Sequence, residues 1–446
     1  MAQVFPFRAL RYNPALVPLE RVLTQPYDKI SRAMQDKYYA ADPHNLITVE
    51  KGRSNPSDTP ENNVYTRAAT ALADWIASGV LRQDPAPWFY AYSQEYAVPG
   101  AEERRIRRGF VGAGRLEAYS AGVVFRHEQT LSGPKADRLE LLRHTQTHTG
   151  QLFMLYSDPR RRVDEILAQA ESSTPDTELC DEYGVIHRLW IVSRPRDISE
   201  IQLAMADQKL VIADGHHRYE TALAYRDECR AGKINPDAAF EHAMMTFINA
   251  SSEGLTILAT HRVAAHIHDF SWPAMLRHLE PWFAAEEFPF SNDADKAEQG
   301  KKFLSCLRSA RSRRAIGVYP AADSQRRAFY ALTLRDGVNL AQLLPRVSPL
   351  QRELDVVLLH EGILEPALGI TRQAVTAEAH LTYEREATAA LDAVDSGRAQ
   401  ICFLLNPCEV EQVMKIATAG EVLPQKSTDF YPKLLSGITM YRVAAS

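Results

Sequence analysis

A fully apolar run, LVIA at residues 210–213, passes without a linker into the polar sequence DGHHR at residues 214–218. The apolar run is typical of a buried strand, and the sequence YETALAYRDECRAG that follows is typical of a helix. A strand that turns directly into a helix leaves free backbone N–H groups at the positive end of the helix dipole. This arrangement favours the binding of a phosphate group.

The side chains of the DGHHR sequence add to this preference. Arg218 is a bidentate phosphate donor, His216 and His217 are further donors, and Asp214 is able to hold a magnesium ion or to orient a proton. The alternative is structural, with Asp214 as the helix cap and the two histidines in a solvated first turn. Two adjacent histidines beside an arginine and an aspartate favour the phosphate site.

A second polar motif, HEQT, begins at His127 after the strand-like sequence VVF. A carboxylate at a strand end, here Glu128, is suited to remove a proton from a substrate hydroxyl. The zinc motif H-E-x-x-H fails, because Leu131 stands where the second histidine is required. A metal-dependent hydrolase built from His127, Glu128, Asp214 and His216 stays an alternative without a complete ligand spacing.

Other segments carry weaker signals. The sequence contains neither a Rossmann glycine motif nor a P-loop, and we expect its arginine runs at 104–108, 160–162 and 311–314 to be mostly solvated. The sequence KSTDFYPK near the C-terminus offers Lys426, Ser427, Thr428 and Lys433 as contacts for an anion. The alternative for this segment is a packed turn before the last strand.

The composition excludes several classes of protein. The chain has 51 basic and 56 acidic side chains, a net charge of −5, so a broad nucleic-acid-binding surface is not expected. A hydrophobic content of 45% indicates a folded protein. We expect no membrane span and no export signal, and therefore a cytoplasmic location. The five cysteines lack a C-x-x-C spacing and are expected to be reduced thiols.

The pattern of apolar residues predicts a mixture of helices and strands, which is an α+β (mixed α/β) fold. We expect strands and turns up to about residue 60, a helix over residues 62–80, and two antiparallel strands joined by a turn at residues 102–105. Helices and strands alternate after residue 158, and a polar, turn-rich stretch at residues 265–300 suggests a boundary.

Six segments, in order and over nearly the whole chain, resemble the bacterial and archaeal domain of unknown function family "ten-fifteen". They are PYDKIS with Tyr27 and Asp28, HEQTLSGPKADRLELL, IADGHHRYETAL, GLTILATHR ending at Arg262, LDVVLLHEGILEPALGI, and KSTDFYPK. The resemblance marks Tyr27, Asp28, His127, Arg262, Lys426, Ser427 and Thr428 as weaker candidates for binding a substrate.

The stretch from LWIVS to RYETA is also similar to the ParB/sulfiredoxin-like fold, in which free serine kinases carry a D-G-H-x-R element and an upstream H-E element. The similarity implies that Glu128 is the catalytic base and that Asp214 assists through magnesium or the substrate. It further implies that the phosphates of ATP or ADP are held by Gly215, His216, His217, Arg218 and Thr221.

Together these resemblances imply a ParB/sulfiredoxin-like core at residues 121–265, with α/β segments at residues 1–120 and 266–446. The leading hypothesis is a phosphotransferase that uses ATP or ADP with Mg²⁺ and acts on a small-molecule hydroxyl such as that of free serine. The alternative is a nucleotide-binding regulatory protein without turnover. The sequence fixes neither the acceptor, nor the choice of ATP over ADP, nor the oligomeric state.

Overall fold

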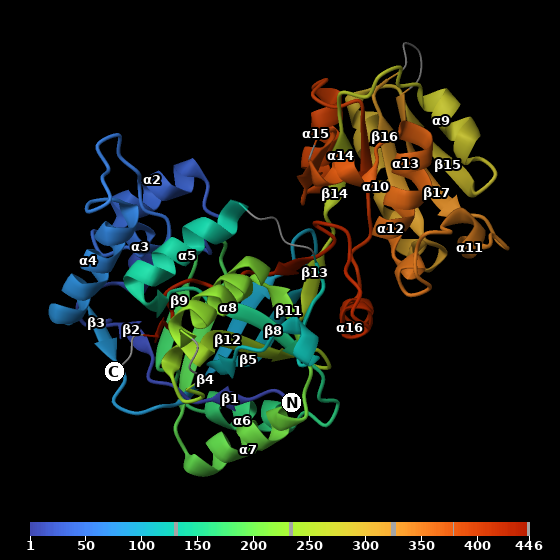
Figure 1. Cartoon of the computed structure of the whole chain (residues 1–446). Coiled ribbons are helices and arrows are strands. Elements are labelled where there is room, and N and C mark those ends of the chain that lie inside the picture. The colour runs from blue at the N-terminus through green and yellow to red at the C-terminus, as the bar shows by residue number, and fades with distance from the viewer. Residues whose placement is uncertain (129–132, 232–234, 323–326, 378, 444–446) are drawn as a thin grey trace. The chain divides into compact units, whose positions relative to one another are not determined.

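A computed structural model describes residues 1–128, 133–231, 235–322, 327–377 and 379–443 of the chain. The chain forms two compact units (Figure 1). Unit 1 contains Met1–Thr256 and Phe430–Ser446, and unit 2 contains Ile257–Asp429.

The described residues of unit 1 build a nine-stranded mixed sheet with the order β6-β11-β8-β12-β5-β4-β10-β9, and β1 pairs with β5. Strand β11 runs parallel to β6 and antiparallel to β8, while β8 runs parallel to β12. The mixed α/β fold is therefore confirmed. The strands are β1 (Val4–Phe5), β4 (Phe89–Ala97), β5 (Arg104–Arg115), β6 (Val124–Arg126), β8 (Leu152–Tyr156), β9 (Thr177–Cys180), β10 (Ile186–Val192), β11 (Leu210–Asp214) and β12 (His242–Asn249).

Helices contribute buried apolar side chains to the core beside this sheet. Val163 of α6, Ile201 of α7 and Tyr219 of α8 belong to the same buried cluster as Phe110 and Phe247 of the central strands. Burying side chains of this size is the main favourable term in folding, so the cluster fixes α8 on the sheet. The helices are α4 (Val64–Ala77), α5 (Gly133–Thr145), α6 (Arg162–Glu171), α7 (Pro195–Ala206) and α8 (His216–Arg230).

Several local predictions are confirmed. Helix α4 lies within the range expected for it, begins after the side-chain cap Asn63 and is followed by Gly79 with a positive φ of 76°. Strands β4 and β5 are antiparallel neighbours as predicted, and the turn that joins them covers residues 98–103, so it begins earlier than expected and Arg104 and Arg105 belong to β5. The predicted strand, polar turn and helix at residues 210–230 form β11 and α8.

The expectation of strands and turns before residue 60 is wrong for much of that segment. Residues there form α1 (Leu19–Val22), α2 (Arg32–Ala41) and α3 (Ile47–Glu50) besides β2 (Leu10–Tyr12). The Ser31 hydroxyl caps α2 by accepting a hydrogen bond from the N–H of Met34. Tyr38 of α2 packs against Ile30 and Ile47, so tertiary packing supports a helix whose sequence is rich in charged and tyrosine residues.

Unit 2 contains a six-stranded sheet with the order β15-β17-β16-β19-β14-β18, in which each recorded pair is antiparallel. Phe303 and Leu307 of α10 and Ala390 and Val394 of α15 are buried in its core. The elements are β14 (His261–Ala264), α9 (Trp272–Leu279), β15 (Phe283–Phe290), α10 (Asp293–Ser309), β16 (Ala315–Pro320), β17 (Arg327–Leu334), α11 (Leu340–Leu343), α12 (Asp355–Leu359), η5 (His360–Leu364), α13 (Glu365–Leu368), α14 (Arg372–Thr376), β18 (Leu381–Glu384), α15 (Ala387–Asp395), β19 (Ile401–Leu404) and α16 (Val410–Thr418).

The units divide the chain at other places than the boundaries expected at residues 120 and 265. Residue 120 falls between β5 and β6, which are strands of one sheet. The polar stretch at 265–300 contains α9, β15 and the start of α10, where Asn292 caps the helix. Polar residues there cap and cover regular elements, which explains why they resembled a linker.

The end of the chain belongs to unit 1. Phe430 and Val443 are buried there, and β21 (Tyr441–Arg442) pairs with β7 (Thr147–His148). The KSTDFYPK segment crosses the boundary of the units along the chain, and only its residues from Phe430 onward belong to unit 1; β20 (Asp429–Tyr431) and β13 (Thr256–Leu258) lie at such boundaries. Residues far apart in sequence therefore meet in the first unit.

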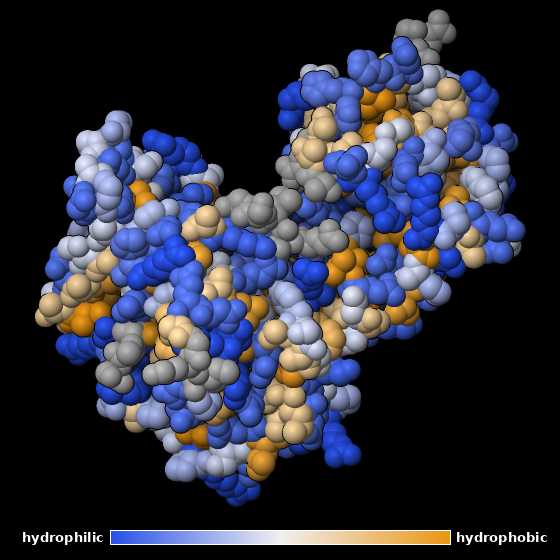
Figure 2. Space-filling model, in the orientation of Figure 1, coloured by the Kyte–Doolittle hydropathy of each residue, from blue (hydrophilic) through white to orange (hydrophobic). Residues whose placement is uncertain are grey.

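On the face shown in Figure 2, hydrophilic side chains cover most of the surface and hydrophobic ones form small separate patches. Among the described residues, no helix is both long and apolar enough to cross a membrane. The five cysteines are all described and all carry free thiols.

Candidate active site

The turn between β11 and α8 shapes the candidate site. Gly215 has φ of 93°, and a Cβ atom at this position would lie 3.1 Å from Cδ2 of Leu152. Glycine is favoured here because other residues are strained in this conformation. No side chain caps the start of α8, and the Gly215 N–H donates to Oδ1 of Asp214 over 3.0 Å. The first turn of α8 thus keeps backbone donors available for a ligand.

The Asp214 carboxylate lies beside the ammonium group of Lys433, with 3.4 Å between Oδ2 and Nζ. Burial by itself raises the pKa of Asp214, but Lys433, Arg218 and His216 outweigh burial and hold this pKa at about 2. Asp214 is therefore ionised at neutral pH. A permanently ionised carboxylate is suited to bind a cation and does not serve as a proton donor.

A buried arginine positions Lys433. Arg107 donates hydrogen bonds to the carbonyl oxygens of Tyr431 (3.2 Å) and Pro432 (2.5 Å). It also donates to the side-chain oxygen of Gln94. The side-chain nitrogen of Gln94 in turn donates to the Lys433 carbonyl oxygen over 2.8 Å. Burial lowers the pKa of Arg107 to about 10, so the guanidinium stays charged at neutral pH. The run at residues 104–108 is predicted to be mostly solvated, and Arg107 is a buried exception.

The side-chain alternation of β5 is the signal that would have found Arg107. Neighbouring Arg108 is exposed and forms an ion pair with Glu171, whereas Arg107 is only 1% exposed. Successive side chains of a strand point to opposite faces, so one member of an arginine run on a strand points inward.

Three imidazoles gather at the start of α8. Nδ1 of His127 lies 2.6 Å from the carbonyl oxygen of Ile212, and the ring centre is 4.8 Å from that of His216. A carbonyl only accepts, so Nδ1 of His127 carries the proton and Nε2 is an acceptor when the ring is neutral. Burial lowers the pKa values of His127, His216 and His217, and that of His216 falls well below its ordinary value.

The candidate base Glu128 lies close to these rings. The charge of Glu128 raises the pKa values of His127 and His217, but burial lowers both values by more. The charge of Asp214 acts on His127 in the same direction. The structure therefore brings the HEQT and DGHHR motifs together around His127, while Gln129 and Thr130 lie outside the described residues.

Four buried polar atoms on α8 have no hydrogen-bond partner among the described residues. They are Nε2 of His216, Nε2 of His217, Nε of Arg218 and Oγ1 of Thr221. Buried polar groups in folded proteins are nearly always paired, and each exception requires an explanation. All four atoms lie in the first two turns of one helix.

Arg218 connects α8 to the N-terminal segment. Its Nη1 donates to the carbonyl oxygen of Gln151 over 2.7 Å, and its Nη2 lies 3.6 Å from Oδ1 of Asp28. The guanidinium carbon lies 5.5 Å from the centre of the Tyr27 ring, within cation–π range. Burial alone would lower the pKa of Arg218, but Asp28 and Asp214 raise it.

A small cavity adjoins Arg218. It has a volume of about 50 Å³, and Arg218 and Thr221 of α8 line it together with Tyr27, Glu50, Arg138 and Thr149. Tyr27 and Asp28, two of the weaker candidates, are thus grouped with Arg218. Glu50 and Arg138 gave no signal in the sequence, because α3 and α5 meet at this point only through folding.

The other weaker candidates, Arg262, Lys426, Ser427 and Thr428, belong to unit 2, so the geometry of the unit 1 cluster does not include them. Arg262 is buried, and its Nε donates to Nε2 of His360 over 3.2 Å. The hydroxyl of Ser427 donates to the carbonyl oxygen of Pro424 over 2.5 Å. The Ser427 hydrogen bond, which reaches three residues back along the chain, is typical of a packed turn.

Among the described residues, no group of three or more His, Cys, Asp and Glu side chains is arranged to hold a metal ion. Asp214 fits the different requirement of magnesium, which proteins commonly hold through one or two carboxylates together with substrate phosphates and water. Asp214 is one ionised carboxylate of this kind, whereas a zinc site takes three or four protein ligands.

The family model "Protein of unknown function (DUF1015)" matches residues 4–357. This chain belongs to that family. The match covers most of unit 1 and the first part of unit 2, and it confirms the family resemblance inferred from the motifs. No curated protein is significantly similar to the chain in sequence.

The solved structures that are similar to this chain at low identity include the following three. A conserved hypothetical protein from Pyrococcus furiosus is 14% identical, with 72% of this chain and 92% of that chain covered and a TM-score of 0.31. A free serine kinase variant in complex with ADP is 10% identical, with coverages of 71% and 89% and a TM-score of 0.33. SbnI from Staphylococcus aureus, truncated at its C-terminus, is 10% identical, with coverages of 73% and 85% and a TM-score of 0.33. These scores establish neither a shared fold nor a shared activity.

Proposed function

We propose that the protein is a nucleotide-dependent phosphotransferase that transfers a phosphoryl group from ATP or ADP to the hydroxyl of a small molecule such as free serine. The site comprises Asp214 to Arg218, Thr221 and Glu128, within a ParB/sulfiredoxin-like core at residues 121–265. The observation that carries the proposal is the set of four unpartnered buried polar atoms in the first two turns of α8.

These atoms match the needs of a nucleotide phosphate. The guanidinium of Arg218 and the imidazoles of His216 and His217 supply hydrogen-bond donors, and the uncapped start of α8 supplies backbone N–H groups. The positive-φ turn at Gly215 lets the start of α8 lie close to Leu152, because a Cβ atom at this position would be 3.1 Å from Cδ2 of Leu152. Phosphoryl transfer depends mainly on such positioning and charge neutralisation.

Asp214 would be the protein ligand of a nucleotide-bound Mg²⁺ ion. Bound Mg²⁺ neutralises charge on phosphate oxygens, which lowers the barrier for attack by a hydroxyl. The carboxylate suits this role because its pKa of about 2 keeps it ionised. Lys433, held by Arg107 and Gln94, supplies a positive charge on the same side.

Glu128 would accept the proton of the acceptor hydroxyl as the hydroxyl oxygen attacks the terminal phosphorus. The bond from that phosphorus to the bridging oxygen breaks, and the bond to the acceptor oxygen forms. Neutral His127, fixed by its hydrogen bond to Ile212, keeps the adjacent environment free of a competing positive charge.

The test combines turnover with binding. The protein is incubated with Mg²⁺, serine and either ATP or ADP, and phosphorus NMR records transfer to serine or to another hydroxyl compound in a metabolite pool. Glu128→Gln is expected to keep nucleotide binding and to lose about 10²- to 10⁴-fold in kcat. Glu117→Gln, in the same unit, is the matched control and is expected to keep kcat.

Arg218→Ala is expected to weaken nucleotide binding itself. Unchanged affinity in this variant would contradict the phosphate site, and the absence of any phosphorylated product would refute the kinase. The alternative function, a nucleotide-binding regulatory protein, is favoured if the nucleotide binds tightly without product and changes the oligomer size.

A further inference from the structure

Unit 2 contains a polar cavity that the proposed phosphotransferase does not use. Its volume is about 460 Å³, which lies within the roughly 300–1,000 Å³ typical of small-molecule sites. The cavity is formed where α10 ends and where α12 and α16 begin, next to the start of β16 and the end of β19, two neighbouring central strands of the sheet. Among its lining residues are Arg311, Arg314, Glu353, Asp355, Asn406 and Glu409.

Several of these side chains are already paired. Arg311 donates to the carbonyl oxygen of Pro407 over 2.8 Å and lies 3.3 Å from the Glu409 carboxylate. The Glu409 carboxylate also caps α16 in a capping box with Gln412. These contacts fix one wall of the cavity and satisfy the charges on that wall.

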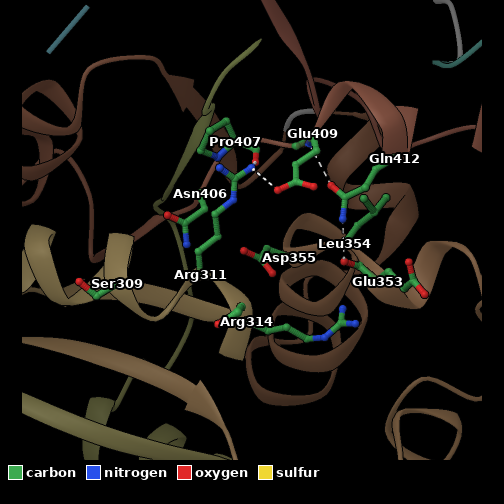
Figure 3. Close-up of a pocket in the computed structure, with 12 residues that line it drawn as sticks. Ser309, Arg311, Arg314, Glu353, Leu354, Asp355, Asn406, Pro407, Glu409 and Gln412 are labelled. Carbon is green, nitrogen blue, oxygen red and sulfur yellow. Dashed lines mark hydrogen bonds and ion pairs between the residues drawn. The ribbon is translucent and has the colours of Figure 1, made fainter. Parts of the chain in front are cut away.

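Asp355 and Arg314 are different, because no ion pair is recorded for either of them among the described residues, and the Asp355 side chain has a hydrogen bond with the Asn406 side chain. Arg314 donates from Nη1 to the carbonyl oxygen of Arg352 over 2.7 Å, and no other hydrogen bond of its guanidinium is recorded among the described residues. Asp355 and Arg314 line the same cavity, and among the described residues they form no ion pair with each other. Figure 3 shows the Asp355 carboxyl between the side chains of Arg311, Glu409 and Arg314.

The surroundings of Asp355 disfavour the charged form of its carboxyl group. Burial raises the pKa of Asp355 to about 6, although Arg314, Asn406 and Arg311 each lower it. Glu353, Glu409 and the thiol of Cys408 also line the cavity, and burial raises the pKa of that thiol to about 12, so it stays neutral. A half-buried carboxylate whose charged form is disfavoured by burial is stabilised by a ligand that brings a positively charged donor.

We propose that this cavity binds a small zwitterionic metabolite, whose amino group contacts Asp355 and whose carboxylate or phosphate contacts Arg314. A free α-amino acid is the simplest member of this class. A cation alone would leave the Arg314 donors unused, and an anion alone would approach three carboxylates. A molecule that carries both an amino group and an acidic group brings a positive charge to Asp355 and a negative charge to Arg314.

The site lies in unit 2 and does not depend on the phosphate site of unit 1. Binding here therefore tests a separate property of the protein, and a kinase assay that fails leaves the outcome of this experiment unaffected. Figure 3 also shows that the lining side chains come from separate segments, so a short motif does not encode the site.

The test uses the full chain and isothermal titration calorimetry with each of the twenty L-amino acids at pH 7.5. We expect at least one to bind, and we expect its amine-only and acid-only analogues to bind at least about tenfold more weakly. Arg314→Ala and Asp355→Asn are each expected to weaken binding by roughly 10- to 100-fold, as expected for the loss of a hydrogen bond to a charged group. Arg313→Ala, in the same turn but outside the cavity lining, is the matched control and is expected to keep the affinity.

Three results would overturn the proposal. One is that no amino acid binds at millimolar concentration. Another is that binding persists unchanged in both Arg314→Ala and Asp355→Asn, which would place the ligand elsewhere. The last is that an analogue without the amino group binds as tightly as the parent. Urea unfolding of each variant, followed by circular dichroism, separates a lost contact from a lost fold.

Discussion

Replacing Asp355 by Asn is expected to make unit 2 more stable at neutral pH. The carboxyl of Asp355 has a pKa of about 6 in the folded protein, against an ordinary value of 3.8, mainly because burial disfavours its charged form. The folded state therefore binds this proton more tightly than the unfolded state does. As the pH rises from about 4 through 6, the unfolded state loses this proton before the folded state does, so the Asp355 carboxyl lowers the free energy of unfolding.

The magnitude follows from the two pKa values. The difference between about 6 and 3.8 corresponds to about 3 kcal/mol well above pH 6, at about 1.36 kcal/mol for each pKa unit. Because Asp355 lines an open cavity, solvent screening reduces this to about 1–2 kcal/mol. Asn has nearly the same shape and no charge, so Asp355→Asn is expected to recover that amount at pH 7.5.

The assay is urea unfolding of the full chain, followed by circular dichroism, at pH 7.5 and at pH 4.5. The variant is expected to be more stable than the parent at pH 7.5, and the difference is expected to shrink to roughly a third at pH 4.5, where the parent carboxyl is largely protonated. Asp392→Asn, at an exposed position of α15, is the matched control and is expected to change little. A variant that is less stable at pH 7.5, or a difference that does not depend on pH, would refute the reasoning.

The remaining predictions concern unit 1. Thr221→Val, which removes a buried hydroxyl without a recorded partner, is expected to change the free energy of unfolding by less than about 1 kcal/mol in urea and to weaken Mg²⁺–ATP binding in calorimetry; a large loss of stability would show that the hydroxyl is satisfied. Gly215→Ala is expected to cost about 1–3 kcal/mol in the same urea assay, because its φ of 93° is strained for alanine, and wild-type stability would contradict this. Lys433→Met is expected to raise the pKa of Asp214 and to lower the free energy of unfolding by about 1 kcal/mol at pH 7.5. This loss is expected to fade as the pH falls toward 2, because Asp214 becomes protonated. An equal loss at pH 3 would indicate lost packing instead. Nucleotide binding is expected to take up protons near pH 6, because His216 and His217 have lowered pKa values that a bound phosphate raises; calorimetry in buffers of different ionisation enthalpy measures this uptake, and none would argue against imidazole contacts.

Local sequence patterns predicted much of the fold, because helix periodicity and capping depend on residues that are close together in the chain. The apolar run at residues 210–213 and the helix at 64–77 follow from periodicity and capping, which neighbouring residues determine. The early helix α2 was missed, because its stability depends on Tyr38 packing against distant Ile47. The interruption of unit 1 by unit 2 was missed for a similar reason, since chain order does not reveal which segments share a core.

The candidate site divides in the same way. The sequence alone determined its centre, since a strand that turns into DGHHR places a glycine turn, two imidazoles and an arginine at one helix start. Only the tertiary structure decided which groups surround that centre: Lys433 and Arg107 beside Asp214, and Asp28 beside Arg218. The physical reason is that a helix start is a local feature, whereas the charges that set its pKa values come from strands and loops far away in the chain. The cavity around Asp355 depends on the tertiary structure entirely, because three separate segments must meet to form it.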